Sequence, residues 1–186
     1  MNSDILNGKV IWITGGNRGI GAAISLKLME SNPKLIISAS SVDSLSKTVP
    51  LLKNNSNVVL LPCNLLKEQE INNTANQIIE QFGKIDFLIN NAGVIKFSSL
   101  VKATTEEFDN QIGVNLKGMF LCSRAVLPSM LERKEGAIIN INSVSSINTY
   151  KYNSVYSASK AGALAMSRCL RDEVRSEGIK IVDIIP

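Results

Sequence analysis

Short apolar runs alternate with longer amphipathic segments along the whole chain. The runs are rich in β-branched residues and predict six strands, at residues 10–14, 35–39, 57–61, 86–90, 137–142 and 180–185. The segments between them have the spacing of helices. This alternation is typical of a parallel sheet that is covered by helices on both faces, so the pattern predicts an α/β fold.

The first helix is expected at residues 19–31, where Pro33 stops it. Helical spacing places one group of its apolar residues on a single side. These residues are Ile20, Ile24, Leu28 and Met29.

Two later helices carry clear terminal signals. A capping-box pattern from Thr104 to Glu107 opens a helix that continues into residues 114–131. The last helix is expected at residues 154–176, and Gly178 is a suitable residue to end it.

The two halves of the chain begin alike, since residues 8–16 and 83–91 both read Gly-Lys followed by an apolar strand and a polar turn. A doubly wound, Rossmann-like sheet built from two halves has this repeat. No linker or low-complexity tract divides the chain, and we expect residues 1–186 to form a single domain.

Composition narrows the class of protein. Hydrophobic residues make up 45% and charged residues 19%, as in ordinary globular proteins. The apolar runs are too short to cross a bilayer, and the N-terminus lacks the pattern of a secretion signal, so we expect a cytoplasmic protein without membrane contact. The net charge of +4 is spread along the chain, which gives nucleic-acid binding little support.

Three cysteines, Cys63, Cys122 and Cys169, are widely spaced and lie in apolar surroundings. We expect them to be buried, reduced thiols without a functional role, and we expect no metal site.

A glycine loop follows the first predicted strand. Gly15, Gly19 and Gly21 fall in the pattern G-x-x-x-G-x-G and lead directly into the first helix. Glycine allows a backbone to turn sharply and approach a pyrophosphate, whose charge is stabilised by N–H groups at a helix N-terminus. The loop therefore predicts dinucleotide binding, and the alternative is a plain tight turn.

The end of the second predicted strand indicates which dinucleotide binds. Residues 38–41 read Ser-Ala-Ser-Ser and lack the acid that would hold the ribose 2′-hydroxyl of NAD. Arg18 is placed to pair with a 2′-phosphate, with help from the Ser40 hydroxyl. We therefore expect NADP rather than NAD, unless Arg18 is merely an exposed loop cation.

The chain contains no histidine, so an acid or base that works near neutral pH needs another side chain with a shifted pKa. Tyr156 and Lys160 are four residues apart and share one helix face, where the ammonium favours the phenolate. Lowering the phenol pKa from about 10 to about 7 takes roughly 4 kcal/mol, which requires burial and a second positive charge. Alone, however, a Tyr-x-x-x-Lys match arises readily by chance.

Five features together resemble the short-chain dehydrogenases/reductases in their order and rough spacing. They are the glycine loop at residues 14–21, the Asn-Asn-Ala-Gly segment at residues 90–93, Asn115, Ser143 and the Tyr156/Lys160 pair. The resemblance covers the whole chain and implies an NAD(P)-binding, Rossmann-like fold. The residues that it and the loop chemistry assign to the cofactor are Gly15, Asn17, Arg18, Gly19, Ile20, Gly21, Ser40, Asn64, Leu65, Asn91, Ala92, Gly93, Tyr156 and Lys160.

The resemblance also implies a catalytic set. Lys160 would hold the nicotinamide ribose and lower the pKa of Tyr156, and the oxidised nicotinamide would supply the second positive charge. Tyr156 would exchange a proton with a ketone or alcohol oxygen, to which Ser143 would hydrogen-bond. Asn115, in a locally opened helix, would help bind a water that connects Lys160 to solvent. Tyr150 and Tyr152, which have no lysine four residues later, are expected at the surface or in a substrate loop.

The chain departs from the family pattern in two places. Asn64 stands where relatives often have an adenine-binding aspartate, and an amide can still bond adenine. Relatives also continue past a sixth strand with a substrate-covering segment and a seventh strand, whereas this sequence ends at Pro186. We therefore expect a domain that is incomplete at its C-terminus, with the sixth strand on an open edge.

The leading function is an NADP-dependent oxidoreductase acting on a ketone/secondary alcohol pair. The alternatives are a truncated NADP-binding module with little or no catalysis, and a structural protein with a vestigial fold. Family members are usually homodimers or homotetramers, built here on helices around residues 114–131 and 154–176.

Overall fold

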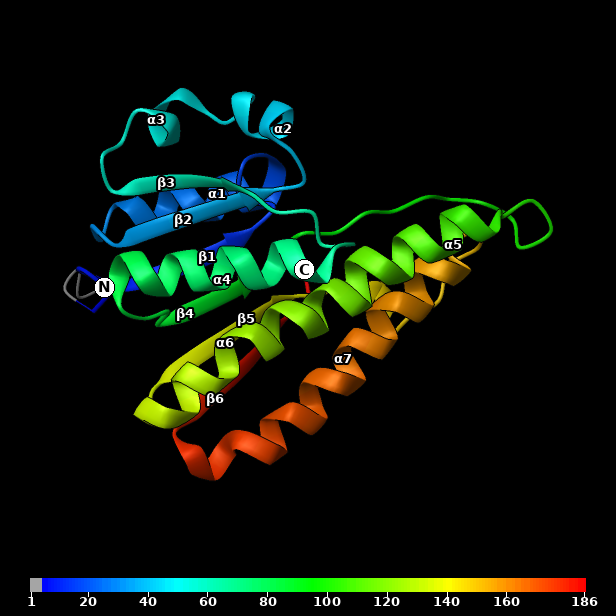
Figure 1. Cartoon of the computed structure of the whole chain (residues 1–186). Helices are drawn as coiled ribbons and strands as arrows, with labels where there is room; N and C mark the ends of the chain where they lie inside the picture. Colours follow the sequence, from blue (N-terminus) through cyan, green and yellow to red (C-terminus); the bar gives the residue numbers. More distant parts are fainter. Residues whose placement is uncertain (1–4) are drawn as a thin grey trace.

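The structure, a computed structural model, describes residues 5–186. Six parallel strands form one sheet in the order β3-β2-β1-β4-β5-β6 (Figure 1). The strands are β1 (Val10–Thr14), β2 (Lys34–Ala39), β3 (Val58–Pro62), β4 (Phe87–Asn90), β5 (Gly136–Ile141) and β6 (Ile179–Ile184). The predicted bounds of β1 are correct, and those of the other strands differ by one residue.

The strand order reverses at the middle of the sheet. β1 pairs with β2 on one side and with β4 on the other, so the chain builds outward first in one direction and then in the other. This is the predicted doubly wound, Rossmann-like topology, in which ligands bind at the carboxyl ends of the strands near the point of reversal.

Helices connect all the strands. The α-helices are α1 (Gly19–Met29), α2 (Val42–Ser46), α3 (Pro50–Lys53), α4 (Glu68–Phe82), α5 (Thr105–Ile112), α6 (Met119–Arg133) and α7 (Ser154–Val174). A π-helical segment, η1 (Gly113–Gly118), joins α5 to α6, and two short 3₁₀ helices, η2 (Val144–Ser146) and η3 (Arg175–Glu177), flank α7.

Alternating residues of β1 separate two apolar cores. Val10 and Trp12 pack on the face that α4 and α6 cover, whereas Ile11 and Ile13 pack on the face of α1, α2 and α3. All four side chains are buried, as expected for a central parallel strand. Figure 1 shows α4, α6 and α7 together on one side of the sheet.

The first helix is shorter than predicted, and Ile20 does not face the sheet. α1 ends at Met29, and Ile24, Leu28 and Met29 pack against the core as expected. Ile20 is 57% exposed because it lies in the first turn, beyond the carboxyl end of β1, where the glycine loop rather than the sheet is its neighbour.

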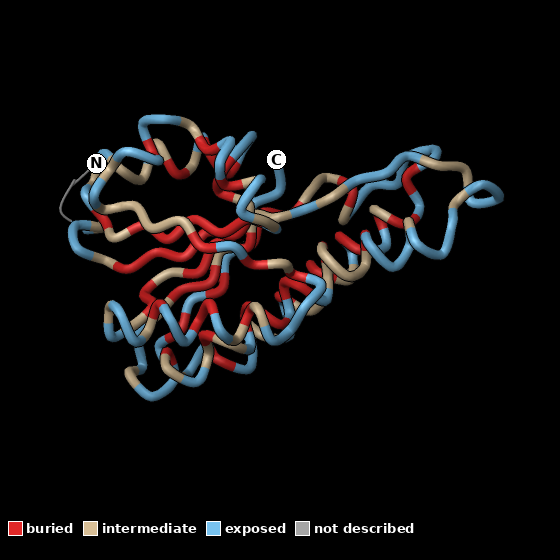
Figure 2. Tube along the Cα trace, turned by 45° about the horizontal axis from the view of Figure 1, so that its top comes forward, coloured by how far each residue is buried: buried red, intermediate tan, exposed pale blue. Residues whose placement is uncertain are grey.

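The predicted helix at residues 114–131 begins inside η1, so it is not a regular α-helix over its whole length. The predicted capping box is present: the Thr104 hydroxyl accepts the Glu107 N–H, and the Glu107 carboxylate accepts the Thr104 N–H. Together α5, the segment before it and the start of α7 extend beyond the sheet, and much of this projection is exposed (Figure 2).

The last strand lies at an edge of the described sheet. β6 pairs with β5, and its Val182 and Ile184 side chains are 44% and 46% exposed. The open apolar edge expected at the sixth strand is therefore present among residues 5–186.

Candidate functional site

A cleft of about 650 Å³ runs along the carboxyl ends of the strands. All of the residues predicted to bind a cofactor line it, from the glycine loop at one end to Tyr156 and Lys160 at the other. Asn115 and Ser143 are not among its lining residues. Several other residues line the cleft that the sequence did not predict, namely Ser38, Ala39, Ser44, Cys63, Val94, Ile95, Val114, Ile141 and Asn142.

The glycine loop needs its glycines for two different reasons. Gly15 and Gly19 have φ angles of +64° and +54°, in the left-handed region that favours glycine. Gly21 needs space instead, because a Cβ atom there would lie 2.2 Å from the Gly15 carbonyl oxygen. The loop can therefore fold tightly against the N-terminus of α1, whose unpaired N–H groups face the cleft.

The segment after β4 is attached to the glycine loop by hydrogen bonds. The Thr14 hydroxyl accepts the backbone N–H groups of Asn91 and Ala92, each at 3.1 Å. The Asn91 side chain donates to the carbonyl groups of Thr14 and Gly15 at 2.9 and 3.0 Å. These bonds fix the two walls of the cleft on either side of the strand reversal.

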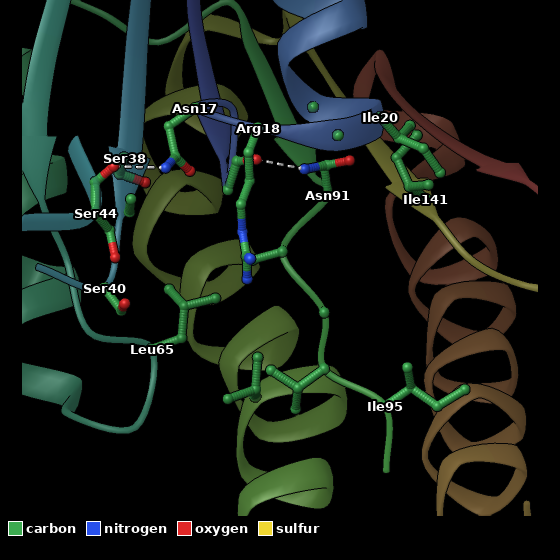
Figure 3. A pocket seen from close by; sticks show the side chains of 18 of the residues that line it. Asn17, Arg18, Ile20, Ser38, Ser40, Ser44, Leu65, Asn91, Ile95 and Ile141 are labelled. Atoms are coloured by element: carbon green, nitrogen blue, oxygen red, sulfur yellow. Dashed lines mark hydrogen bonds between the residues drawn. The ribbon is translucent and has the colours of Figure 1, made fainter. Parts of the chain in front are cut away.

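Arg18 and the serines after β2 approach the cleft from two sides. Figure 3 shows the Arg18 side chain extending into the cleft between Ser40 and Asn91. The buried Asn17 side chain donates to the Ser44 carbonyl at 2.8 Å, which joins the glycine loop to α2. This contact places the Arg18 guanidinium and the hydroxyl groups of the serines after β2 together at one end of the cleft.

The turn after β3 supplies the next part of the wall. The Asn64 side-chain oxygen accepts the Leu66 N–H at 3.0 Å, so its NH₂ group is the part left for a ligand. Cys63, beside it, is buried, and burial raises the pKa of its thiol to about 11. A neutral thiol at this position makes the wall apolar and unreactive.

Tyr156 and Lys160 lie on the first two turns of α7, at the other end of the cleft. The Lys160 Nζ atom donates to the Ile141 carbonyl at 2.9 Å and lies 5.9 Å from the centre of the Tyr156 ring. Burial lowers the pKa of Lys160 to about 8, so the ammonium form still predominates at neutral pH. The helix therefore presents a buried cation next to a half-buried phenol.

Ser143 follows β5 and begins η2. Its hydroxyl accepts the Ser145 N–H at 3.1 Å, and its own N–H donates to the Asn142 side chain. Because the hydroxyl acts as an acceptor in this turn, its proton remains free to donate to another oxygen.

Asn115 lies in the π-helical segment, which supplies the local opening that was expected there. Its side chain exchanges two hydrogen bonds of 2.8 Å with the Val94 backbone and donates to the Ser159 hydroxyl at 3.0 Å. These contacts use the amide to hold the segment after β4 against α7. Asn115 lines a small inner cavity together with Lys160.

One expectation about the cysteines is wrong. Cys63 and Cys122 are buried as predicted, but Cys169 is exposed on α7. Over residues 5–186, no group of three or more His, Cys, Asp or Glu side chains is placed to hold a metal ion. In the same part of the chain, no helix has the length and apolarity that a membrane crossing requires.

Known proteins share both the sequence pattern and the fold. The family model described as short chain dehydrogenase matches residues 9–186. An uncharacterized oxidoreductase of Staphylococcus aureus (strain MRSA252) is 32% identical over 182 residues, which cover 98% of this chain and 78% of the relative. One of Staphylococcus haemolyticus is 31% identical over 181 residues, covering 97% and 78%.

Solved structures of other proteins have a similar fold. A metagenomic short-chain oxidoreductase in complex with NADP superimposes with a TM-score of 0.90 at 32% identity, over 97% of this chain and 82% of that one. A short-chain dehydrogenase from Streptomyces avermitilis gives 0.88 at 27% identity, over 96% and 65%. Because the family model matches residues 9–186 and these relatives share both sequence and fold, the chain belongs to the short-chain dehydrogenase family of oxidoreductases.

Proposed function

We propose that the protein is an NADP-dependent oxidoreductase that transfers a hydride between the nicotinamide cofactor and a ketone or secondary alcohol. The observation that carries this proposal is the position of Tyr156 and the buried Lys160 in a cleft whose other end is the glycine loop. The NADP complex of the metagenomic relative supports the same cofactor here.

The cleft suits a dinucleotide. Its volume of about 650 Å³ is in the usual range for cofactor sites. A side chain at Gly21 would close the approach of α1 to the loop, so the glycine keeps N–H groups open toward a pyrophosphate. Arg18 and Ser40, both exposed and both lining the cleft, are suited to a 2′-phosphate. The other residues predicted to contact the cofactor line the cleft between Arg18 and Ser40 at one end and Tyr156 and Lys160 at the other.

The proposal gives each of the chain's own residues a role that is consistent with its surroundings. The bound dinucleotide supplies the hydride and, when oxidised, a second positive charge. Lys160 holds a positive charge near Tyr156, with its Nζ atom 5.9 Å from the centre of the ring. Tyr156 gives its proton to the ketone oxygen as the carbon accepts the hydride, and takes it back in the reverse direction. Ser143 donates its free proton to the same oxygen, and Asn115 holds the cleft wall.

Replacing the phenol tests the chemistry. Tyr156→Phe should lower the rate of NADPH oxidation with a ketone panel by about 10²- to 10⁴-fold, because general acid catalysis is lost. NADPH binding, followed by fluorescence, should persist. Tyr150→Phe is the matched control, since Tyr150 is 51% exposed and does not line the cleft. Unchanged turnover in Tyr156→Phe would refute the proposal, and NADPH binding by the unmodified protein without turnover would favour the binding module.

Replacing the arginine tests the cofactor. Arg18→Ala should weaken NADPH binding by about 10- to 100-fold and leave NADH binding nearly unchanged, because only NADPH carries the 2′-phosphate. The exposed Arg168 on α7 provides the control Arg168→Ala. Tighter binding of NADH than NADPH by the unmodified protein would contradict the assignment.

Three further expectations belong to the proposal. They are a cytoplasmic location, a single domain over residues 1–186, and a homodimer or homotetramer. We expect the assembly to use the long helices α6 and α7, and sedimentation of the full-length protein would test it.

A further inference from the structure

The cleft has two chemically different ends, which fix where the parts of a dinucleotide lie. Tyr156 and Lys160 line it beside the end of β5, whereas Ser40, Asn64 and Leu65 line it where β2 and β3 end. Hydride transfer at Tyr156 requires the nicotinamide at the first end. The purine of the same dinucleotide therefore lies at the second end, against the turn that follows β3.

Hydrogen bonds within this turn fix which way the Asn64 amide points. Its Oδ1 atom accepts the Leu66 N–H at 3.0 Å, and its backbone carbonyl accepts the Lys67 N–H at 2.9 Å. A rotated amide would place its NH₂ group against the Leu66 N–H, donor against donor. The side-chain oxygen is therefore held by the turn, and the Nδ2 group is the free end.

A carboxylate holds the same residue from the next helix. Glu70 on α4 accepts the Asn64 N–H at 2.9 Å and also pairs with Lys67. These contacts use the backbone N–H, the backbone carbonyl and the side-chain oxygen of Asn64, but among residues 5–186 its Nδ2 group donates to no protein acceptor. Asn64 is half-buried and lines the cleft, so this donor is available to a ligand.

The next residue adds a second donor at the same place. Leu65 is 8% exposed, and its backbone N–H has no acceptor within the part of the chain that the structure describes. An N–H group without a partner in a buried residue costs free energy, which an acceptor on a ligand would recover. Leu65 and Ser40 both line this end of the cleft (Figure 3). The wall at the purine end therefore offers two neighbouring donors.

Purines differ in the groups that they present to such a wall. Adenine carries an amino group on C6, which is a donor, next to the acceptor N7. A 6-oxopurine such as hypoxanthine or guanine carries the acceptor O6 on C6, next to the same acceptor N7. Two neighbouring donors can pair with O6 and N7 together. Against adenine, one donor pairs with a ring nitrogen and the other meets the 6-amino group, which is also a donor.

We propose that Asn64 is a specificity-determining residue, which makes the purine end of the cleft favour a 6-oxo group over the 6-amino group of adenine. Dinucleotide phosphates of hypoxanthine or guanine then bind more tightly than NADPH. An aspartate in the same place would keep the Leu66 bond with one oxygen and offer the other oxygen to a 6-amino group. Exchange of one NH₂ group for one oxygen thus reverses the preference. This role for Asn64 rests on the proposed function, which places the purine relative to Tyr156.

Binding of two dinucleotides tests this role without turnover. They are NADPH and reduced nicotinamide hypoxanthine dinucleotide phosphate, an analogue that differs from NADPH in the purine alone. The fluorescence of the reduced nicotinamide reports the binding of both. We expect the unmodified protein to bind the analogue about 3- to 10-fold more tightly than NADPH, because one hydrogen bond in a half-buried site is gained in place of a clash between donors.

Asn64→Asp should reverse the preference, so that NADPH binds about 3- to 10-fold more tightly than the analogue. The added negative charge repels the phosphates of both dinucleotides, but this effect cancels in the ratio of the two Kd values. Asn64→Ser is a second variant, whose shorter hydroxyl can still accept the Leu66 N–H and hold the turn. Its ratio should fall between those of the unmodified protein and Asn64→Asp.

Asn76→Asp is the matched control, because Asn76 is exposed on α4 and does not line the cleft. Its ratio should equal that of the unmodified protein. Tighter binding of NADPH than of the analogue by the unmodified protein overturns the proposal, and so does an unchanged ratio in Asn64→Asp. If neither dinucleotide binds, the proposed function fails together with it. Binding with the expected ratios but without reduction of any ketone would refute the proposed hydride transfer alone.

Discussion

Asn91 is joined to Thr14 by two hydrogen bonds, one from its backbone N–H to the Thr14 hydroxyl at 3.1 Å and one from its side chain to the Thr14 carbonyl at 2.9 Å. The residues are far apart in sequence, but Thr14 ends β1 and Asn91 directly follows β4, its neighbour in the sheet. The contact lies at the reversal of strand order, so it sets the shape of the cleft.

Removing the Thr14 hydroxyl should therefore loosen both the fold and the site. Thr14→Val keeps the β-branched shape but leaves the N–H groups of Asn91 and Ala92 without their acceptor. We expect a loss of about 1 to 3 kcal/mol in the free energy of unfolding, measured in urea, and weaker NADPH binding. Thr14→Ser keeps the acceptor and should lose less than Thr14→Val. Equal stability of the two variants would contradict this role for the hydroxyl.

Gly21 should tolerate no side chain. In Gly21→Ala the new Cβ would lie 2.2 Å from the Gly15 carbonyl oxygen and 2.4 Å from the Asn91 side chain. Relief requires the loop to move, so we expect a loss of about 1 to 3 kcal/mol in unfolding free energy despite the better helix propensity of alanine. Gly93→Ala is a useful comparison, because its nearest contact would be an ordinary 3.5 Å. A Gly21→Ala variant as stable as Gly93→Ala would rule out the steric explanation.

The parts of the fold that sequence predicted are those with local signals. Apolar β-branched runs located all six strands to within one residue, and the Thr104 capping box located α5. The glycine loop was equally readable, since positive φ angles and close approach leave a direct mark on residue type.

The parts that were missed depend on contacts between distant segments. Nothing near Asn17 in sequence indicates its bond to the Ser44 carbonyl, and nothing near Asn90 indicates its bond to the Asn140 side chain. Ile20 has helical spacing with core residues, yet it lies past the end of the sheet. Periodicity gives the face of a helix but not where the neighbouring layer stops.

The three thiols should differ sharply in reactivity. Burial raises the pKa of Cys63 to about 11 and that of Cys122 well above its ordinary value, so both are almost entirely protonated at pH 8. Cys169 is exposed. A thiol reagent such as DTNB should therefore modify one cysteine quickly in the folded protein and three after denaturation. In Cys169→Ser the rapid phase should disappear, and its persistence would mean that a buried thiol is accessible.

Lys160 should make stability depend on pH in a defined window. Burial lowers its pKa from 10.5 to about 8, so between these values the unfolded chain binds a proton that the folded protein does not. Unfolding free energy therefore rises with pH across the window, by about 3 kcal/mol in total from this group. Below pH 8 the buried ammonium contributes its full cost.

The pH dependence can be isolated by subtraction. Lys160→Met removes the titrating group, so the difference in unfolding free energy between the unmodified protein and this variant should grow in favour of the unmodified protein from pH 8 to 10.5. Denaturant unfolding at several pH values measures it. The exposed Lys102 provides the control Lys102→Met, whose difference from the unmodified protein should stay nearly constant. A flat difference for Lys160→Met would show that the ammonium is well solvated, which is incompatible with its burial behind the cleft.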